Sequence, residues 1–263
     1  MISDINGAAL EAASPQGRNI VTIASGKGGV GKTWLSVTLA HAIANAGRRA
    51  MLFDGDLGLA NVDIQLGLMP EYDLGSVVAG RVELKDAVTR YPEGQFDILA
   101  GKSGSGALAL LSGSRVSDLR ESLLELTQSY DKVIVDLGAG VESGVRALIG
   151  ANGTILVVTN DEPTSITDAY AFIKITAMKH PGADLRIVVN QATGASDGNR
   201  TYGALKKACE SFLKISPPLA GVIRRDEKVR DTIRHQTSLL LRHPTCNAAK
   251  DVEAVAARLL DEP

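Results

Sequence analysis

The chain has 263 residues, with 28 Lys and Arg against 30 Asp and Glu, which gives a formal net charge of −2. Hydrophobic residues make up 44% and charged residues 22%, a composition typical of a globular protein that excludes a disordered chain. The near-zero net charge excludes a global basic field that would attract the whole molecule to nucleic acid. Two distant cysteines, Cys209 and Cys246, form no CxxC pair, and the four histidines show no HExxH spacing. The sequence therefore excludes a disulfide scaffold and a Cys-rich zinc site, and it fits a reducing compartment.

The first segment is small and polar. Residues 1–17 contain Asp4 and Glu11, no basic region and no long apolar stretch, so we expect no signal peptide there. The chain has no charge-free apolar window of about 18 residues, which a membrane-spanning helix would need. We expect residues 1–18 to form a flexible leader and residues 19–263 to form a single domain.

Seven short apolar runs, rich in β-branched residues, follow in chain order. They span residues 20–24, 49–54, 96–100, 132–136, 154–159, 185–190 and 219–223. Runs of this kind are typical of strands that are buried on both faces of a parallel sheet.

Stretches with a 3.6-residue apolar period separate these runs. The three clearest stripes are Leu35, Leu39, Ala42 and Ile43; Val116, Leu119, Leu123, Leu124 and Leu126; and Ala169, Phe172, Ile173 and Thr176. The alternation of strand and helix predicts an α/β fold with a doubly wound, mainly parallel sheet flanked by helices. Functional loops are then expected at the carboxyl ends of the strands. The glycine- and serine-rich residues 102–114 are predicted to form a flexible connector.

The first run leads straight into residues 26–33, GKGGVGKT, which match GxxxxGK[ST] between a predicted strand and a predicted helix. In this motif successive backbone N–H groups and the helix N-terminus bind phosphate oxygens. Lys32 is expected to reach the β- and γ-phosphates of ATP or ADP, and the Thr33 hydroxyl to bind Mg²⁺. The nucleotide-binding residues are predicted to be Gly28, Gly29, Val30, Gly31, Lys32, Thr33 and Trp34. The alternative is a glycine-rich turn that only packs a helix on a sheet.

Lys27 adds a second lysine to this loop, and the form KGGVGKT resembles the deviant phosphate loop of the MinD/ParA class of P-loop ATPases. In that family the extra lysine reaches across a nucleotide-sandwich homodimer to the partner's phosphates, so the resemblance implies a catalytic role for Lys27 in trans. A cation delivered by a second subunit makes hydrolysis depend on assembly. The alternative is that Lys27 is an exposed loop charge.

Two carboxylates, Asp54 and Asp56, end the second predicted strand, which lies beside the phosphate loop in a doubly wound sheet. A carboxylate there can orient the attacking water or hold the Mg²⁺ shell. In the family that the sequence resembles, the position of Asp56 belongs to switch I and positions the water, and Asp54 helps to organise the site. Turn formation and helix capping are the alternative roles for both residues.

The run at residues 132–136, KVIVD, ends in Asp136 and has the Walker B pattern, whose carboxylate binds Mg²⁺ directly or through water. The small residues at 137–141 suit a switch II loop. The family more often has Thr, Ser or Pro around Leu137 and Gly138, and this departure affects the expected Mg²⁺ shell and rate rather than the place of the site. The predicted catalytic residues are therefore Lys27, Lys32, Asp56 and Asp136, and the predicted metal ligands are Thr33, Asp56 and Asp136.

A base-binding region is expected further along the same edge of the sheet. Asn190 ends a predicted strand and can offer both a donor and an acceptor to the adenine edge. The family has an Asn at this site and uses backbone after a late strand, which implies contacts from Val222 and Ile223. The alternative role of Asn190 is to cap a helix or turn.

Three segments resemble one branch of the family, the FlhG/FleN proteins, which are ATPases that limit flagellar number and placement. The segments are residues 54–68 (DGDLGLANVDIQLGL), 161–170 (DEPTSITDAY) and 229–236 (VRDTIRHQ). The resemblance covers residues 19–260 and implies a slow ATPase, stimulated by a partner, that forms a homodimer with ATP and Mg²⁺. It also implies a protein partner such as a flagellar regulator or basal-body component. The location that it implies is the cytoplasm, at a pole or at the membrane through the partner.

The other function classes are a ParA-type partition ATPase that rides on nonspecific DNA, a metal-cluster carrier on the same fold, and a small-molecule P-loop enzyme. A basic cluster is relevant to the first of these, and it consists of Arg224, Arg225, Lys228, Arg230, Arg234 and Arg242. The alternative to DNA binding is that this cluster is an ordinary solvated helix face, because acidic residues lie between the basic ones and no aromatic residues are interleaved with them. The C-terminal residues 247–263 have a narrow apolar stripe and an acidic polar face, so we expect a core-packing helix rather than a lipid anchor.

Overall fold

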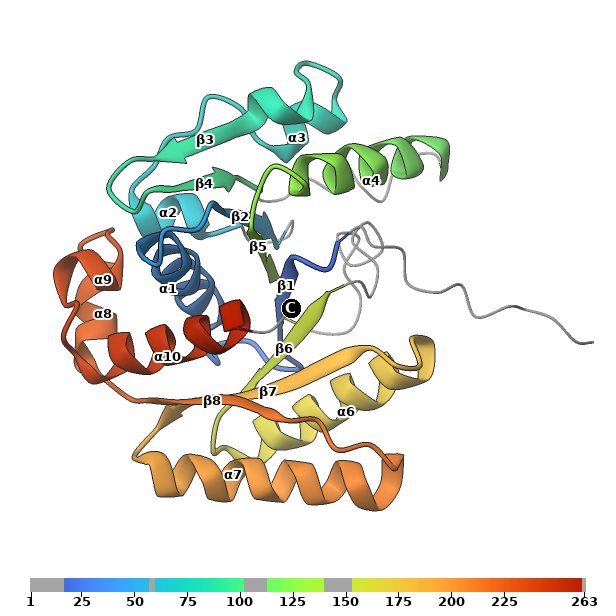
Figure 1. Cartoon of the computed structure of the whole chain (residues 1–263), viewed down its shortest axis with the longest axis vertical. Helices are drawn as coiled ribbons and strands as arrows, with labels where there is room; N and C mark the ends of the chain where they lie inside the picture. Colours follow the sequence, from blue (N-terminus) through green and yellow to red (C-terminus); the bar gives the residue numbers. More distant parts are fainter. Residues whose placement is uncertain (1–16, 57–59, 102–112, 140–152, 262–263) are drawn as a thin grey trace, which may run out of the picture.

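The computed structural model describes residues 17–56, 60–101, 113–139 and 153–261. Its centre is an eight-stranded sheet in the order β3-β4-β2-β5-β1-β6-β7-β8, in which all neighbours are parallel except β3 and β4 (Figure 1). The strands are β1 (Ile20–Ala24), β2 (Ala50–Gly55), β3 (Val88–Tyr91), β4 (Phe96–Leu99), β5 (Lys132–Leu137), β6 (Thr154–Thr159), β7 (Asp184–Ala192) and β8 (Leu219–Arg224). The predicted doubly wound α/β fold is confirmed.

Helices cover both faces of the sheet. One face carries α1 (Lys32–Asn45), α2 (Val62–Leu66), α8 (Glu227–Arg234), α9 (Leu239–Arg242) and α10 (Asn247–Asp261). The other face carries α3 (Leu74–Val78), the 3₁₀ helix η1 (Leu84–Ala87), α4 (Gly113–Thr127), α6 (Pro163–Lys179), α7 (Ala195–Ala208) and the π-helical segment η3 (Cys209–Leu213).

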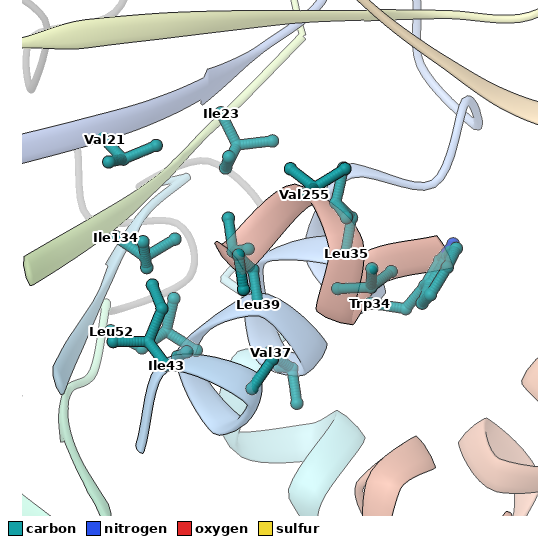
Figure 2. Packing of buried hydrophobic residues seen from close by; sticks show 14 of the residues in the cluster. Val21, Ile23, Trp34, Leu35, Val37, Leu39, Ile43, Leu52, Ile134 and Val255 are labelled. Carbon is teal, nitrogen blue, oxygen red and sulfur yellow. The ribbon is translucent and has the colours of Figure 1, made fainter. Parts of the chain in front are cut away.

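The central strand β1 explains why both layers are needed. Alternate side chains point to opposite faces of a strand, and every residue of β1 is buried. Val21 and Ile23 join the core cluster beneath α1 and α10 (Figure 2). Ile20 and Ala24 join the cluster on the opposite face. The continuous apolar run that predicted this strand therefore reflects burial on two sides.

The seven predicted strands and the three predicted helical stripes are all present, but one strand was missed. β3 is a four-residue edge strand, VTRY, that pairs antiparallel with β4. It is only partly buried, and Arg90 reaches across to Asp97 at 2.9 Å. A short polar edge strand lacks the apolar run on which the other predictions depend. The predicted leader (residues 1–16) and most of the predicted connector (residues 102–112) lie outside the described residues.

The last helix, α10, packs against α1 and β8, with Val252, Val255, Ala256 and Leu259 buried. The predicted core-packing role of this segment is therefore confirmed. None of the helices in the described part of the chain combines the length and the apolar character that crossing a membrane requires.

A buried histidine ties α9 to the middle of α1. His41 is 3% exposed, and its Nδ1 lies 2.6 Å from the Ser238 hydroxyl, beside the ring of Phe96. Burial lowers the pKa of His41 from 6.5 to about 4. Between these two pH values only the unfolded chain binds the proton, so this residue destabilises the fold as the pH falls through that window.

We predict that the thermal stability of the wild type falls between pH 6.5 and pH 4 more steeply than that of His41→Gln. The pKa shift of His41 changes the free energy of unfolding by about 3 kcal/mol at most between these pH values, because one pKa unit corresponds to about 1.4 kcal/mol. Calorimetry at a series of pH values measures the two slopes. His180→Gln, beyond the end of α6, is the matched control and keeps the wild-type slope. Equal slopes for wild type and His41→Gln contradict the prediction.

Candidate phosphate site

The loop between β1 and α1 has the geometry of an anion site. Gly29 and Gly31 adopt positive φ angles of 79° and 90°, and Gly31 occupies the N-cap position of α1. No side chain caps this helix end, and its first turn contains no acidic residue. The N–H groups that begin a helix have no partner within the helix and carry its positive dipole end. The loop therefore offers several N–H donors to phosphate oxygens, as the motif predicted.

The loop is held from outside by Asn190, at the end of β7. The Asn190 side chain is buried and donates from Nδ2 to the carbonyl of Val30 at 2.7 Å, while its Oδ1 accepts from the Gln191 N–H at 2.9 Å. A Cβ atom on Gly31 would lie 2.5 Å from Trp34 Nε1 and 2.6 Å from Asn190 Nδ2. Asn190 thus supports the phosphate loop directly, and its expected contact with adenine stays a prediction.

Lys32 lies at the start of α1, below the loop. Its Nζ donates to the Ser25 hydroxyl at 3.0 Å, and Ser25 in turn donates to the Lys27 carbonyl at 2.7 Å. Burial lowers the pKa of Lys32, and the nearby carboxylates of Asp136 and Asp56 oppose that shift. The fully buried Ser25 was missed by the sequence reading, because a serine beside a glycine loop carries no distinctive signal.

Asp136 ends β5 directly beside β1, opposite Ile23. It is 1% exposed, and its Oδ1 accepts a hydrogen bond from the Ser36 hydroxyl at 3.1 Å. Burial raises the pKa of Asp136 to about 6, against the opposing effects of a hydrogen bond from Thr33 and the charge of Lys32. The structure therefore brings the two predicted metal ligands Thr33 and Asp136 together.

Asp54 lies opposite Asp136 on the neighbouring strand β2. Its carboxylate accepts the backbone N–H groups of Asp56 at 3.2 Å and of Asn61 and Val62 at 3.0 Å each. Burial raises the pKa of Asp54 to about 7, although these three hydrogen bonds oppose the shift. Asp54 is therefore the residue that closes the turn carrying Asp56, and the intervening residues 57–59 lie outside the described residues.

Asp56 reaches from this turn to the beginning of the loop after β5. A Cβ atom on Gly138 would lie 3.1 Å from Asp56 Oδ1, so a larger residue at 138 would crowd that carboxylate. The departure from the family pattern at this position thus has a packing consequence: glycine leaves room for Asp56. Residues 140 and 141 of the predicted switch II loop are not among the described residues.

The side chains between the phosphate loop and the ends of β2 and β5 are suited to bind Mg²⁺. Carboxylates of Asp56 and Asp136 and the hydroxyl of Thr33 are hard oxygen donors of the kind that Mg²⁺ prefers. Within the described parts of the chain, no group of three His, Cys, Asp or Glu side chains is placed to hold a metal ion. An ion here would therefore complete its shell with water and with phosphate oxygens of a nucleotide, as is usual for Mg²⁺.

Lys27 is bound within its own chain. Its Nζ lies 2.5 Å from Oε2 of Glu162, which precedes α6, and 2.8 Å from the hydroxyl of Thr164, in the first turn of that helix. Asn160 supports Glu162 with a hydrogen bond of 3.2 Å. The pKa of Glu162 is lowered, chiefly by its hydrogen bond from Lys27. About a third of the Lys27 side chain remains exposed at the front of the loop.

The two predicted base contacts from β8 use their side chains for packing. Ile223 is fully buried in the cluster beneath α1, and Val222 packs on the opposite cluster beside Gly198. Only their backbone atoms remain for a base, and a nucleotide contact from this strand stays a prediction.

Residues 21–239 match the CobQ/CobB/MinD/ParA nucleotide binding domain. The chain belongs to that family. Its similarity to the antiactivator FleN of Pseudomonas aeruginosa is 38% identity over 240 residues, which cover 91% of this chain and 85% of FleN. The flagellum site-determining protein YlxH of Helicobacter pylori is 28% identical, over 92% of this chain and 82% of YlxH.

A solved structure of the septum site-determining protein MinD from Pyrococcus horikoshii, complexed with Mg-ADP, is also similar. The TM-score is 0.76 and the identity 25%, over 92% of this chain and 95% of MinD. As a MinD/ParA-family member, this chain is a nucleotide-binding ATPase, and its relatives support a site-determining switch.

We predict that Gly31→Ala strongly weakens nucleotide binding and lowers the melting temperature, because the added methyl group displaces Trp34 and Asn190 and the positive φ disfavours Ala. The expected loss of stability is about 1 kcal/mol or more. Gly47→Ala, beyond the far end of α1, is the matched control, since Gly47 also has a positive φ, of 77°, but open space surrounds its Cβ position. Thermal melting and titration with fluorescent ADP measure both effects, and equal behaviour of the two variants would refute the argument.

Proposed function

We propose that the protein is an ATP-dependent dimerising switch that regulates the number or placement of flagella. The proposal rests on the position of Lys27 at the front of the phosphate loop. One chain by itself supplies the other residues that the predicted site needs. Lys32, Thr33, Asp56 and Asp136 supply the internal site, whereas Lys27 is turned away from it to Glu162. A loop cation that its own site does not use is available to a second subunit.

In the proposed cycle the loop N–H groups and Lys32 bind the triphosphate and hold it in place. Asp56 orients the attacking water and accepts its proton, while Asp54 keeps the Asp56 turn closed. Asp136 and Thr33 would hold Mg²⁺, which when bound neutralises charge on the phosphates. Lys27 leaves Glu162 and contacts the partner's phosphates, so that hydrolysis requires the dimer.

The exchange of Lys27 between two acceptors is feasible because the resting contact is exposed. More than half of the Glu162 side chain is accessible to solvent. Exposed ion pairs contribute little to stability, whereas a desolvated contact between an ammonium and a phosphate is stronger. Formation of the dimer therefore favours transfer of Lys27 from the carboxylate to the phosphate.

The flagellar assignment rests on resemblance to FleN and YlxH, whose names describe an antiactivator and a flagellum site-determining protein. The three segments that carry the resemblance form the Asp54–Asp56 turn with α2, the Glu162 segment that binds Lys27, and α8. We infer a protein partner of the flagellar regulatory or basal-body kind, and action in the cytoplasm, at a pole or at the membrane through that partner.

We predict that Asp56→Ala binds ATP and accumulates as a dimer with ATP hydrolysis reduced about 100-fold or more, because it lacks the group that orients water. Light scattering with ADP and with ATP measures the mass, and phosphate release measures the rate. Hydrolysis at the wild-type rate would show that Asp56 has no such role.

Lys27→Ala tests assembly separately from binding. We expect this variant to bind ATP with near wild-type affinity but to remain monomeric and inactive, since the trans contact is missing. Lys32→Ala is the contrasting variant and should lose nucleotide binding itself. A Lys27→Ala protein that dimerises and hydrolyses ATP normally would contradict the proposed switch.

The second candidate function is a ParA-type positioner that uses nonspecific DNA, and it is favoured by the exposed basic residues of α8. Two of the six residues in the basic cluster are already neutralised by acids, because Arg224 pairs with Asp251 and Arg242 pairs with Asp231. Retention on random-sequence DNA with ATP, lost steeply as salt rises, would favour this function. Binding to a flagellar regulator without DNA retention favours the first.

The cysteines give no support to a metal-cluster carrier. Cys209 is buried, and burial raises the pKa of its thiol to about 11, which disfavours the thiolate that a cluster needs. Cys246 is partly buried and accepts a hydrogen bond from the Ala249 N–H at its sulfur. Neither thiol lies in a paired arrangement.

A further inference from the structure

Large apolar side chains are exposed where α2 meets α8. Ile64 on α2 is 59% exposed, Met69 just after α2 is 97% exposed, and Ile233 on α8 is 40% exposed. Their neighbours on the inner side, Val62 and Leu66, are buried in the core cluster. The outward apolar residues are therefore additional to those that the fold needs for packing.

The two helices form one surface. Gln236, just past the end of α8, donates from Nε2 to the carbonyl of Ile64 at 3.0 Å, and its Cβ lies close to Gly67. Ile233 and Arg230 are three residues apart within α8, so they lie on the same side of that helix, and α8 is in contact with α2. We name Ile64, Met69, Arg230, Ile233 and Arg234 together the α2–α8 patch.

The rim of this patch is basic. Arg225, Lys228, Arg230 and Arg234 are exposed. The acids on the α8 side are largely engaged: Asp226 caps α8 through the Lys228 N–H, and Asp231 is bound by Arg242 and His243 at 2.6 Å each. On the α2 side, Asp63 accepts the Ile64 N–H at 2.8 Å. Glu227 is the exposed acid at the start of the helix. Among the described residues of α8, positive charge thus exceeds free negative charge.

We propose that the α2–α8 patch docks an acidic amphipathic segment of a partner protein. A nucleic acid would neutralise the arginines but would leave Ile64, Met69 and Ile233 without an apolar partner. Arg and Met are enriched at protein interfaces, and flexible Met side chains adapt to a docked surface. A segment with apolar residues on one face and carboxylates on its edges complements both features.

The patch also adjoins the nucleotide site, and this step rests on the proposed switch. Val62 is the first residue of α2, and its N–H is bound by Asp54, as is that of Asn61. Asp56 lies in the same turn. We infer that a change in the Asp56 turn on nucleotide binding displaces the start of α2 and Ile64, because Asp54 joins the two through the N–H groups of Asp56, Asn61 and Val62.

The test uses a fluorescein-labelled synthetic helix peptide with Leu on one face and Glu on the other, titrated with the full chain and followed by anisotropy. We expect Ile64→Ser with Ile233→Ser to weaken binding about tenfold or more, as loss of central apolar contacts does. Met178→Ser with Phe212→Ser is the matched control, because those two residues are also largely exposed but lie on the opposite face of the sheet. The control keeps wild-type affinity.

Charge is tested in the same way. Arg230→Glu with Arg234→Glu should abolish peptide binding, whereas Lys174→Glu with Lys207→Glu on α6 and α7 should not. A version of the peptide with Lys in place of Glu should not bind the wild type. Methyl NMR of the wild-type protein tests the same surface without any substitution. We expect the Ile64 and Ile233 methyl signals to shift when the peptide is added.

Peptide binding that is unaffected by the serine pair, or absent altogether, overturns the proposal. So does binding of a random-sequence DNA duplex that depends on Arg230 and Arg234 and is indifferent to the serine pair. Equal peptide affinity in the ADP state and in the ATP state of Asp56→Ala overturns the coupling. A chain that stays monomeric with ATP but binds the peptide through these residues counts against the dimerising switch and leaves the docking surface standing.

Discussion

Two carboxylates buried side by side, Asp54 and Asp136, are the constraint on which the site depends. Both are 1% exposed and lie opposite each other on β2 and β5. Burying two acids so close together is unfavourable unless each is compensated. The chain compensates them with backbone N–H groups, the hydroxyls of Thr33 and Ser36, and Lys32. The remaining negative potential, directly below a loop of N–H donors, favours a nucleotide that arrives with a cation.

The strand order places the phosphate loop between two different sets of side chains. Because β1 lies between β5 and β6, the loop after β1 meets the acids on one side and the β6–α6 segment on the other. The first side holds Asp54 and Asp136, beside the predicted Mg²⁺ ligands. The second side holds Lys27 through Glu162, and Asn190 of β7 supports the loop through the Val30 carbonyl. In the proposed switch, hydrolysis and assembly would therefore depend on one loop but on side chains from different halves of the sheet.

The sequence was sufficient to predict the fold, and the structure brings Lys32, Thr33 and Asp136 together as the sequence predicted. The reasons are physical. Long apolar runs identify buried strands, and the spacing of Gly26, Gly31, Lys32 and Thr33 is dictated by phosphate geometry. The residues that sequence reading missed act through space: Ser25 and Ser36 are ordinary serines until the fold places them against Lys32 and Asp136. Glu162, which binds Lys27 within the same chain, is 135 residues away from it in the sequence, so no local pattern could identify this contact.

The packing of α1 links the two ends of the chain. The helix that carries the phosphate loop is buried along most of its length, and one of its main neighbours is α10, more than 200 residues later. During synthesis, α1 leaves the ribosome long before α10 exists to cover it. Until then its apolar side chains have only part of their final surroundings, so the helix that follows the phosphate loop acquires its native packing only after α10 has been synthesised.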